Sequence, residues 1–162
     1  MLNATATNAD SSENENNRRK QVKIVMRVYG TPAPQGSKKL FNGHMVEASK
    51  KVTPWREAIV SQAIRDNHNS LMIQSAVSVR ITFMFERPAF HFTTKGLREN
   101  APTYVAKTPD LDKLCRSTLD GLTEAGVLRD DKFVVILHAQ KVFWDDKSGA
   151  LIEVEEVDVP NE

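Results

Sequence analysis

Acidic side chains gather in one short stretch of the sequence, residues 108–131, which reads TPDLDKLCRSTLDGLTEAGVLRDD. Asp110 and Asp112 open it, and Asp130 and Asp131 close it. Two carboxylates about 4 Å apart repel by roughly 4 kcal/mol at an effective dielectric near 20, so a cluster of them needs a cation. Oxygen-only ligands favour hard ions such as Mg²⁺, for which Mn²⁺ can substitute. The stretch therefore predicts a divalent-ion site for phosphodiester hydrolysis, with Asp110, Asp112, Asp130 and Asp131 as metal ligands.

One basic residue lies within reach of these acids. Arg116 follows Asp112 by four residues, and Asp120 follows Arg116 by four, so the three share one side of a helix. A cation there could contact the scissile phosphate and balance the charge that develops in the transition state. We interpret Arg116 as a catalytic stabiliser. Asp120 faces away from the apolar stripe and is interpreted as structural, fixing a neighbouring loop.

Each of these residues also has an ordinary interpretation. Asp110 at a helix start is commonly a cap, and Asp130 with Asp131 before a strand is commonly a solvated turn. Asp112 with Arg116 is commonly a surface pair at i, i+4 spacing. Taken singly, the ordinary interpretations are favoured. The joint occurrence of all of them in one short stretch favours a metal site.

The elements that would position these residues are a helix and the strand after it. Pro109 and Asp110 start a helix that runs to about Ala125, and Gly126 ends it. Apolar and small residues recur on it at helical spacing, namely Leu111, Leu114, Cys115, Thr118, Leu119 and Leu122. Residues 133–143 then alternate as a strand. A helix followed by a short turn could return the chain so that both pairs of acids meet at one end of a sheet.

The remaining chain predicts an α/β fold of the α+β type, a small mixed sheet flanked by two or three helices. Strands are predicted at 22–29, 75–86 and 150–157, and a tight turn at Asn42-Gly43 joins two short extended pieces. Pro54 begins a further helix. The segment 87–107 lacks periodicity and is predicted to be an irregular loop. We expect a polar, disordered arm at 1–20, one domain at 21–158 and a tail at 159–162.

Composition narrows the class of protein. The single cysteine, Cys115, excludes an internal disulfide and a cysteine-based zinc site, and no apolar run is long enough to span a membrane. The polar N-terminus predicts no secretory signal, so we expect a cytoplasmic protein. Residues 1–107 carry 16 Lys and Arg against 8 Asp and Glu, a net charge of +8, whereas residues 108–162 carry 6 against 13, a net charge of −7. A basic part that attracts phosphates and an acidic part that binds metal suit a nuclease.

A set of basic residues is predicted to bind DNA: Lys38, Lys39, Lys50, Lys51, Arg56 and Lys113. The first five lie around the predicted hairpin. Phosphate contact and a simply solvated surface both remain open for this set. Trp55 is interpreted as a core or interface anchor.

The acidic stretch resembles the RusA family of Holliday junction resolvases. The shared pattern is Asp110-Leu111-Asp112, the basic Arg116, Leu119-Asp120-Gly121-Leu122, Gly126 and Asp130-Asp131. The resemblance implies that Asp110, Asp112 and Asp131 are the essential metal-binding acids, with a smaller contribution from Asp130. Arg116 stands where the family usually has a catalytic lysine. Arginine keeps the charge but cannot donate a proton near neutral pH.

The resemblance also implies a homodimer that binds four-way DNA junctions and cuts opposed strands in recombination and repair, with Mg²⁺ as cofactor. Two-fold symmetric DNA suits a two-fold symmetric protein. Three alternatives stay open: a Mg²⁺-dependent nuclease for flaps, forks or other branched DNA, a catalytically weak junction-binding protein, and a phospho-acceptor signalling domain. The last needs about five alternating β/α units, more than the sequence predicts.

Overall fold

The computed structural model describes residues 21–36, 38–42, 44–47 and 50–158. The predicted arm at 1–20 and tail at 159–162 lie outside them. The described elements are β1 (Lys23–Tyr29), β2 (Lys38–Phe41), β3 (His44–Glu47), α1 (Val52–Arg65), β4 (Val77–Glu86), the 3₁₀ turn η1 (Ala89–His91), β5 (Phe92–Thr93), β6 (Gly96–Leu97), α2 (Leu111–Glu124), the 3₁₀ turn η2 (Asp131–Phe133), β7 (Val134–Trp144) and β8 (Gly149–Glu156). No described helix has the length and apolar character needed to cross a membrane.

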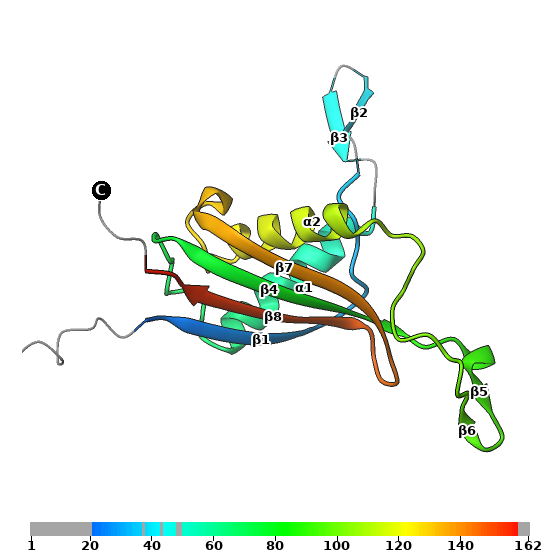
Figure 1. Cartoon of the computed structure of the whole chain (residues 1–162). Helices are drawn as coiled ribbons and strands as arrows, with labels where there is room; N and C mark the ends of the chain where they lie inside the picture. Colours follow the sequence, from blue (N-terminus) through cyan, green and yellow to red (C-terminus); the bar gives the residue numbers. More distant parts are fainter. Residues whose placement is uncertain (1–20, 37, 43, 48–49, 159–162) are drawn as a thin grey trace, which may run out of the picture.

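A four-stranded mixed sheet is the centre of the fold, in the order β1-β8-β4-β7 (Figure 1). β8 pairs antiparallel with both β1 and β4, whereas β4 and β7 run parallel. Both α-helices pack on the same face of the sheet, and α1 and α2 contact each other. The predicted fold class, a small mixed sheet flanked by two or three helices, is confirmed, and the described residues form two α-helices.

Alternation along β1, β8 and β4 builds the core. Met26 of β1 lies opposite Ile152 of β8, which lies opposite Ile81 of β4, and all three side chains are fully buried. Successive strand residues point to opposite faces, so every second residue of these strands packs against the helices. From α1, Trp55 is buried and donates its indole N–H to the Thr118 hydroxyl at 3.1 Å. Its predicted role as a core anchor is confirmed.

Helix α2 matches its prediction closely. Asp110 is the residue before its first turn, Ala125 follows its last, and Gly126 has the positive φ of 72° that favours glycine. The buried residues are Leu114, Cys115, Ser117, Thr118, Gly121 and Leu122, with Leu111 and Leu119 partly buried. Gly121 is buried where α2 faces α1. A Cβ at this position would lie only 2.8 Å from Cδ1 of Ile59 in α1, so glycine allows the two helices to approach closely.

Several predicted boundaries are wrong by one or two residues. α1 starts at Val52 and not at Pro54, which lies inside its first turn, where a missing N–H is still harmless. β4 starts at Val77 and not at residue 75, and β8 covers 149–156 and not 150–157. β7 starts at Val134, because the residues from Asp131 to Phe133 form η2. The hairpin predicted around Asn42 is confirmed, since β2 and β3 pair antiparallel across it.

The prediction of an irregular loop over 87–107 is wrong in part. The segment contains η1 and the small antiparallel pair β5–β6, which projects from the body of the molecule (Figure 1). Strands of two residues are too short to produce a periodic pattern, so periodicity does not predict them. The described residues contain only two α-helices and one parallel strand pair, which excludes the alternating β/α units of a phospho-acceptor domain.

Candidate active site

A groove of about 780 Å³ lies between α2 and the edge strand β7. Its polar side chains are Asp112 and Arg116 from α2 and Asp131 from η2. Apolar and small residues line the rest, namely Leu111, Cys115, Leu119, Leu137 and Ala139. The structure therefore brings three of the predicted catalytic residues to one groove, from two segments of the chain.

Helix geometry and a strand irregularity position these side chains. Asp112 lies in the first turn of α2, with Arg116 one turn later on the same side. Asp131 opens η2, directly before β7. The register of β4 against β7 shifts between Val77, which is opposite Val134, and Ser78, which is opposite Ile136. Such a bulge bends the strand and re-aims the residues beside it.

The polar groups in the groove are not engaged with one another. Asp112, Asp131 and Arg116 form no ion pair with any residue that the structure describes, although Asp112 and Arg116 have the spacing of a surface pair. The ordinary interpretation of that pair is therefore wrong. Cys115 beside them is buried, and burial together with the Asp112 charge raises the pKa of its thiol. It is a neutral part of the groove wall.

Asp110 lies on another side of the first turn of α2. It lines a second hollow, of about 500 Å³, and its carboxylate accepts a hydrogen bond of 2.6 Å from Nζ of Lys113. This bond and the lysine charge lower the pKa of Asp110 and raise that of Lys113. The carboxylate does not cap the helix, although its backbone holds the cap position.

Asp130 has the local role that its turn position suggested. Its carboxylate accepts a hydrogen bond of 2.9 Å from the backbone N–H of Lys132 and caps η2. That bond lowers the pKa of Asp130. Within residues 21–36, 38–42, 44–47 and 50–158, no three acidic, histidine or cysteine side chains lie close enough to hold a metal ion. One chain alone thus offers Asp112 and Asp131 in a shared groove, with Asp110 elsewhere.

The predicted DNA-binding residues fall into three groups. Lys51 and Lys113 line the same second hollow as Asp110, and Lys50 is exposed beside Lys51. Lys38 and Lys39 contribute backbone to β2, but their side chains lie outside the described part of the structure.

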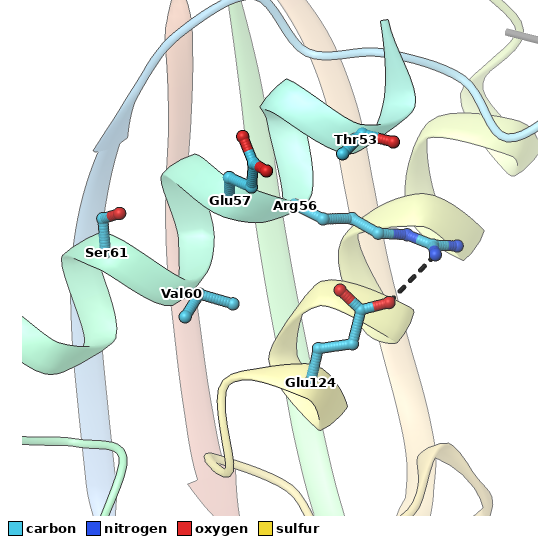
Figure 2. A pocket seen from close by; sticks show the side chains of 6 residues that line it. All are labelled: Thr53, Arg56, Glu57, Val60, Ser61 and Glu124. Carbon is cyan, nitrogen blue, oxygen red and sulfur yellow. Dashed lines mark hydrogen bonds and ion pairs between the residues drawn. The ribbon is translucent and has the colours of Figure 1, made fainter. Parts of the chain in front are cut away.

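Arg56 differs from the rest of this basic set. Its guanidinium contacts Asp120 at 2.6 Å and Glu124 at 2.9 Å, both on α2, and donates to Oε1 of Gln35 at 2.6 Å. Figure 2 shows it reaching across to Glu124 beside a hollow of about 350 Å³ that contains none of the predicted catalytic acids. Gln35 in turn donates its backbone N–H to the carbonyl of Lys113. Asp120 thus has the predicted structural role and fixes the loop before β2 through Arg56.

Sequence reasoning missed two features of this region. The engagement of Arg56 joins residues more than sixty positions apart in the chain, so no local pattern could reveal it. The apolar lining from β7, Leu137 and Ala139, was interpreted as ordinary strand residues. The sequence shows that residues 133–143 alternate as a strand, but it does not show that this strand lies at the edge of the sheet.

Residues 29–155 match the family model described as endodeoxyribonuclease RusA, so the match covers most of the chain and includes Asp110, Asp112, Arg116, Asp130 and Asp131. No curated protein matches the chain.

Proposed function

Because this chain belongs to the RusA family of endodeoxyribonucleases, which resolve Holliday junctions, we propose that it is a Mg²⁺-dependent homodimer that cuts opposed strands of a four-way junction. The observation that carries this proposal is the groove in which Asp112, Asp131 and Arg116 meet without internal ion pairs. Carboxylates and a guanidinium that form no ion pair among the described residues suit the binding of a negatively charged phosphate together with a divalent cation.

We assign Asp112 and Asp131 to the divalent ion and Arg116 to the scissile phosphate. Mg²⁺ usually takes one or two protein carboxylates and fills its other positions with water and phosphate oxygens, so this donor set fits it. When bound, the ion neutralises the acids and polarises the phosphate. Arg116 supplies a positive charge with two parallel N–H groups, which fits two phosphate oxygens. It holds the phosphate, and it is not a proton donor.

Asp110 is proposed as a third ligand, which requires it to leave Lys113. Both side chains of that ion pair are about half exposed, at 50% and 48%. Exposed pairs contribute about 0–1 kcal/mol, so a divalent ion can replace the lysine at small cost. Lys113 would then be free for a DNA phosphate beside Lys51, in the hollow that both residues line.

The edge of β7 supports the homodimer. Residues 141–143 are covered by the segment 103–105, because Val105 donates to the carbonyl of Lys141 and Phe143 to that of Thr103. The section 134–140 has no strand on that side among the described residues. It exposes Val135, Ile136 and Leu137, with 56%, 41% and 43% of their surface accessible. An uncovered apolar edge invites another strand, and we propose that a second copy supplies it.

This pairing would combine residues of two subunits. A two-fold axis makes two copies of one strand run antiparallel, so the uncovered section would pair with itself about Leu137. The start of one β7 would then lie beside Lys141 of the other, whose Nζ donates to the carbonyls of Lys107 and Pro109 just before α2. We propose that Asp131 of the partner subunit thereby reaches Asp110 and Asp112. In one chain Asp112 and Asp131 line the same groove, and the dimer would bring the partner's Asp131 to this pair of acids and to Asp110.

The basic residues near the first turn of α2 are proposed to bind phosphates, in particular Lys50, Lys51 and Lys113. Lys38 and Lys39 stay predicted DNA contacts on the adjoining hairpin. Arg56 is excluded from this proposal, because its guanidinium already serves two carboxylates and an amide.

A cleavage assay tests the proposed function. The full chain would be incubated with Mg²⁺ and labelled mobile and fixed four-way junctions, Y-forks, flaps and linear duplex. We expect paired nicks in junctions, loss of cleavage with a chelator, and loss with Asp131→Asn. Asp66→Asn, an exposed acid at the end of α1, is the matched control and should cut like the wild type. Equal cutting of duplex and junction, or full activity of Asp131→Asn, would contradict the proposal.

A further inference from the structure

The projecting segment Ala89–Leu97, here called the β5–β6 arm, exposes large apolar side chains. Phe90 has 70% of its surface accessible, Phe92 37% and Leu97 47%. The arm extends away from the sheet and helices (Figure 1). Clustered exposed apolar residues on a small protein usually mark a surface that binds something.

The base of the arm is firmly held. His91 is buried and packs edge-on against Phe90 on one side, at 4.6 Å between ring centroids, and Phe143 of β7 on the other, at 4.8 Å. Arg98 donates its backbone N–H to the carbonyl of His91 and its Nε to that of Phe90. These contacts fix the exposed position of Phe90, so binding of a partner would not lose free energy by ordering this side chain.

The arm is also anchored to the element that bears the site. Arg87 at its start contacts Asp145 at 2.8 Å and the carbonyl of Pro102 at 2.8 Å. After the arm, residues 103–105 pair along the end of β7, and Lys141 holds the carbonyls of Lys107 and Pro109. The chain from the arm to the first turn of α2 is therefore pinned to β7, which fixes the arm relative to the groove.

The charge of this segment selects the kind of partner. Residues 87–107 carry four basic residues, Arg87, Lys95, Arg98 and Lys107, against the single acid Glu99. Among the described residues, Lys95 and Arg98 form no ion pair. DNA offers both kinds of contact that this segment can make. Its phosphates attract the unpaired cations, and its sugars and base edges can pack against the apolar rings.

We propose that the β5–β6 arm is a second DNA-binding element, which lies in a groove of a duplex arm of the branched substrate. Lys95 and Arg98 contact phosphates on either side, and Phe90 and Phe92 contact sugars and base edges. The major groove, about 12 Å wide, admits a two-stranded ribbon. This inference rests on the proposed function, in that the DNA is the same junction that the groove cuts.

The test is junction affinity as a function of salt, measured by fluorescence anisotropy with the full chain in Ca²⁺. Each phosphate contact contributes about 0.9 to the slope of log K against log salt, so Lys95→Ala should lower that slope by about this amount. Phe90→Ala should weaken binding about tenfold without changing the slope, because it removes apolar contact only. Lys23→Ala and Ile64→Ala, an exposed cation on β1 and an exposed apolar residue on α1, are the matched controls.

Wild-type affinity and slope in both arm variants would overturn the proposal. The proposal would also be overturned if Phe90→Ala kept the wild-type DNA affinity but changed the oligomeric state of the DNA-free protein, because the arm would then bind a second copy of the chain. A wild-type protein that binds junctions with the arm-dependent slope but never cuts them in Mg²⁺ would contradict the proposed function and leave the arm intact. Junction cutting by wild type and arm variants with equal affinity would contradict the arm alone.

Discussion

Strands β4 and β7 are parallel neighbours with opposite surroundings. β4 is paired on both sides and has five buried residues, Val77, Val79, Ile81, Phe83 and Met84. Among the described residues, β7 pairs with β4 along its length and with the segment 103–105 at one end, and none of its residues is buried. The apolar residues of β4 complete the core of one chain. On β7, Leu137 and Ala139 border the groove that holds Asp112 and Asp131.

In this fold, the stability of the chain and the proposed function depend on different strands. Substitutions in β4 should change the free energy of unfolding, and substitutions around β7 should change cleavage or assembly.

Asp112→Asn should lower the rate of junction cleavage by about 10³-fold or more, because a metal site contributes several kcal/mol to the transition state. Junction affinity should persist or improve, since a charge that repels phosphate is lost. The measurement is single-turnover cleavage in Mg²⁺ beside anisotropy in Ca²⁺. Asp66→Asn again serves as control. Cleavage at the wild-type rate would remove Asp112 from the site.

Phe83→Ala should lower the free energy of unfolding by about 3–5 kcal/mol, because it leaves a cavity in the core. Leu137→Ala on β7 should cost the single chain less than about 1 kcal/mol, since Leu137 is already 43% exposed. Urea unfolding and sedimentation equilibrium would measure both effects. The Leu137 variant should instead weaken the dimer. Equal destabilisation by the two variants would mean that the contrast between the strands is wrong.

Arg116→Ala should lower the cleavage rate by about 10²- to 10³-fold, the usual loss when one group that stabilises transition-state charge is removed. Arg116→Lys should keep most of the activity, because the positive charge remains. Arg65→Ala, an exposed arginine at the end of α1, is the matched control. An alanine variant that cuts like the wild type would show that the role assigned to Arg116 is wrong.

The smallest effect concerns the base of the β5–β6 arm. Burial, assisted by the charges of Arg87 and Lys107, lowers the pKa of His91 below its ordinary value of 6.5. The folded chain then binds fewer protons than the unfolded chain, so the free energy of unfolding falls as the pH drops below about 6.5. His91→Gln should show a shallower fall between pH 7.5 and 5.5 in urea unfolding. The same slope in both proteins would contradict this.

The sequence predicted the parts of this molecule that are set by local patterns. α2, with its stripe and its stop at Gly126, is amphipathic over its whole length, and β1, β4 and β8 alternate clearly. It could not predict distant pairings. The sequence predicts that Arg56 binds DNA, because its ion pairs with Asp120 and Glu124 arise only when α1 packs on α2 and no local pattern reveals them.

The candidate site shows the same division. Periodicity placed Asp112 and Arg116 on one side of α2, as the structure has them. The expected gathering of all the acids depends on tertiary placement, and in one chain Asp110 faces Lys113 while Asp130 caps η2. The β5–β6 arm could not be predicted from the sequence, because strands as short as β5 and β6 show no periodic pattern.

Mixed dimers test most directly whether the acids at the start of β7 act together with those at the first turn of α2 of the partner subunit. Asp112→Asn and Asp131→Asn proteins, each inactive alone, would be mixed, unfolded and refolded together, then assayed for nicking of a fixed junction in Mg²⁺. A shared site predicts that nicking returns, because each mixed dimer contains one site with both acids intact. A mixture as inactive as either variant, with mixed dimers present, would contradict the account.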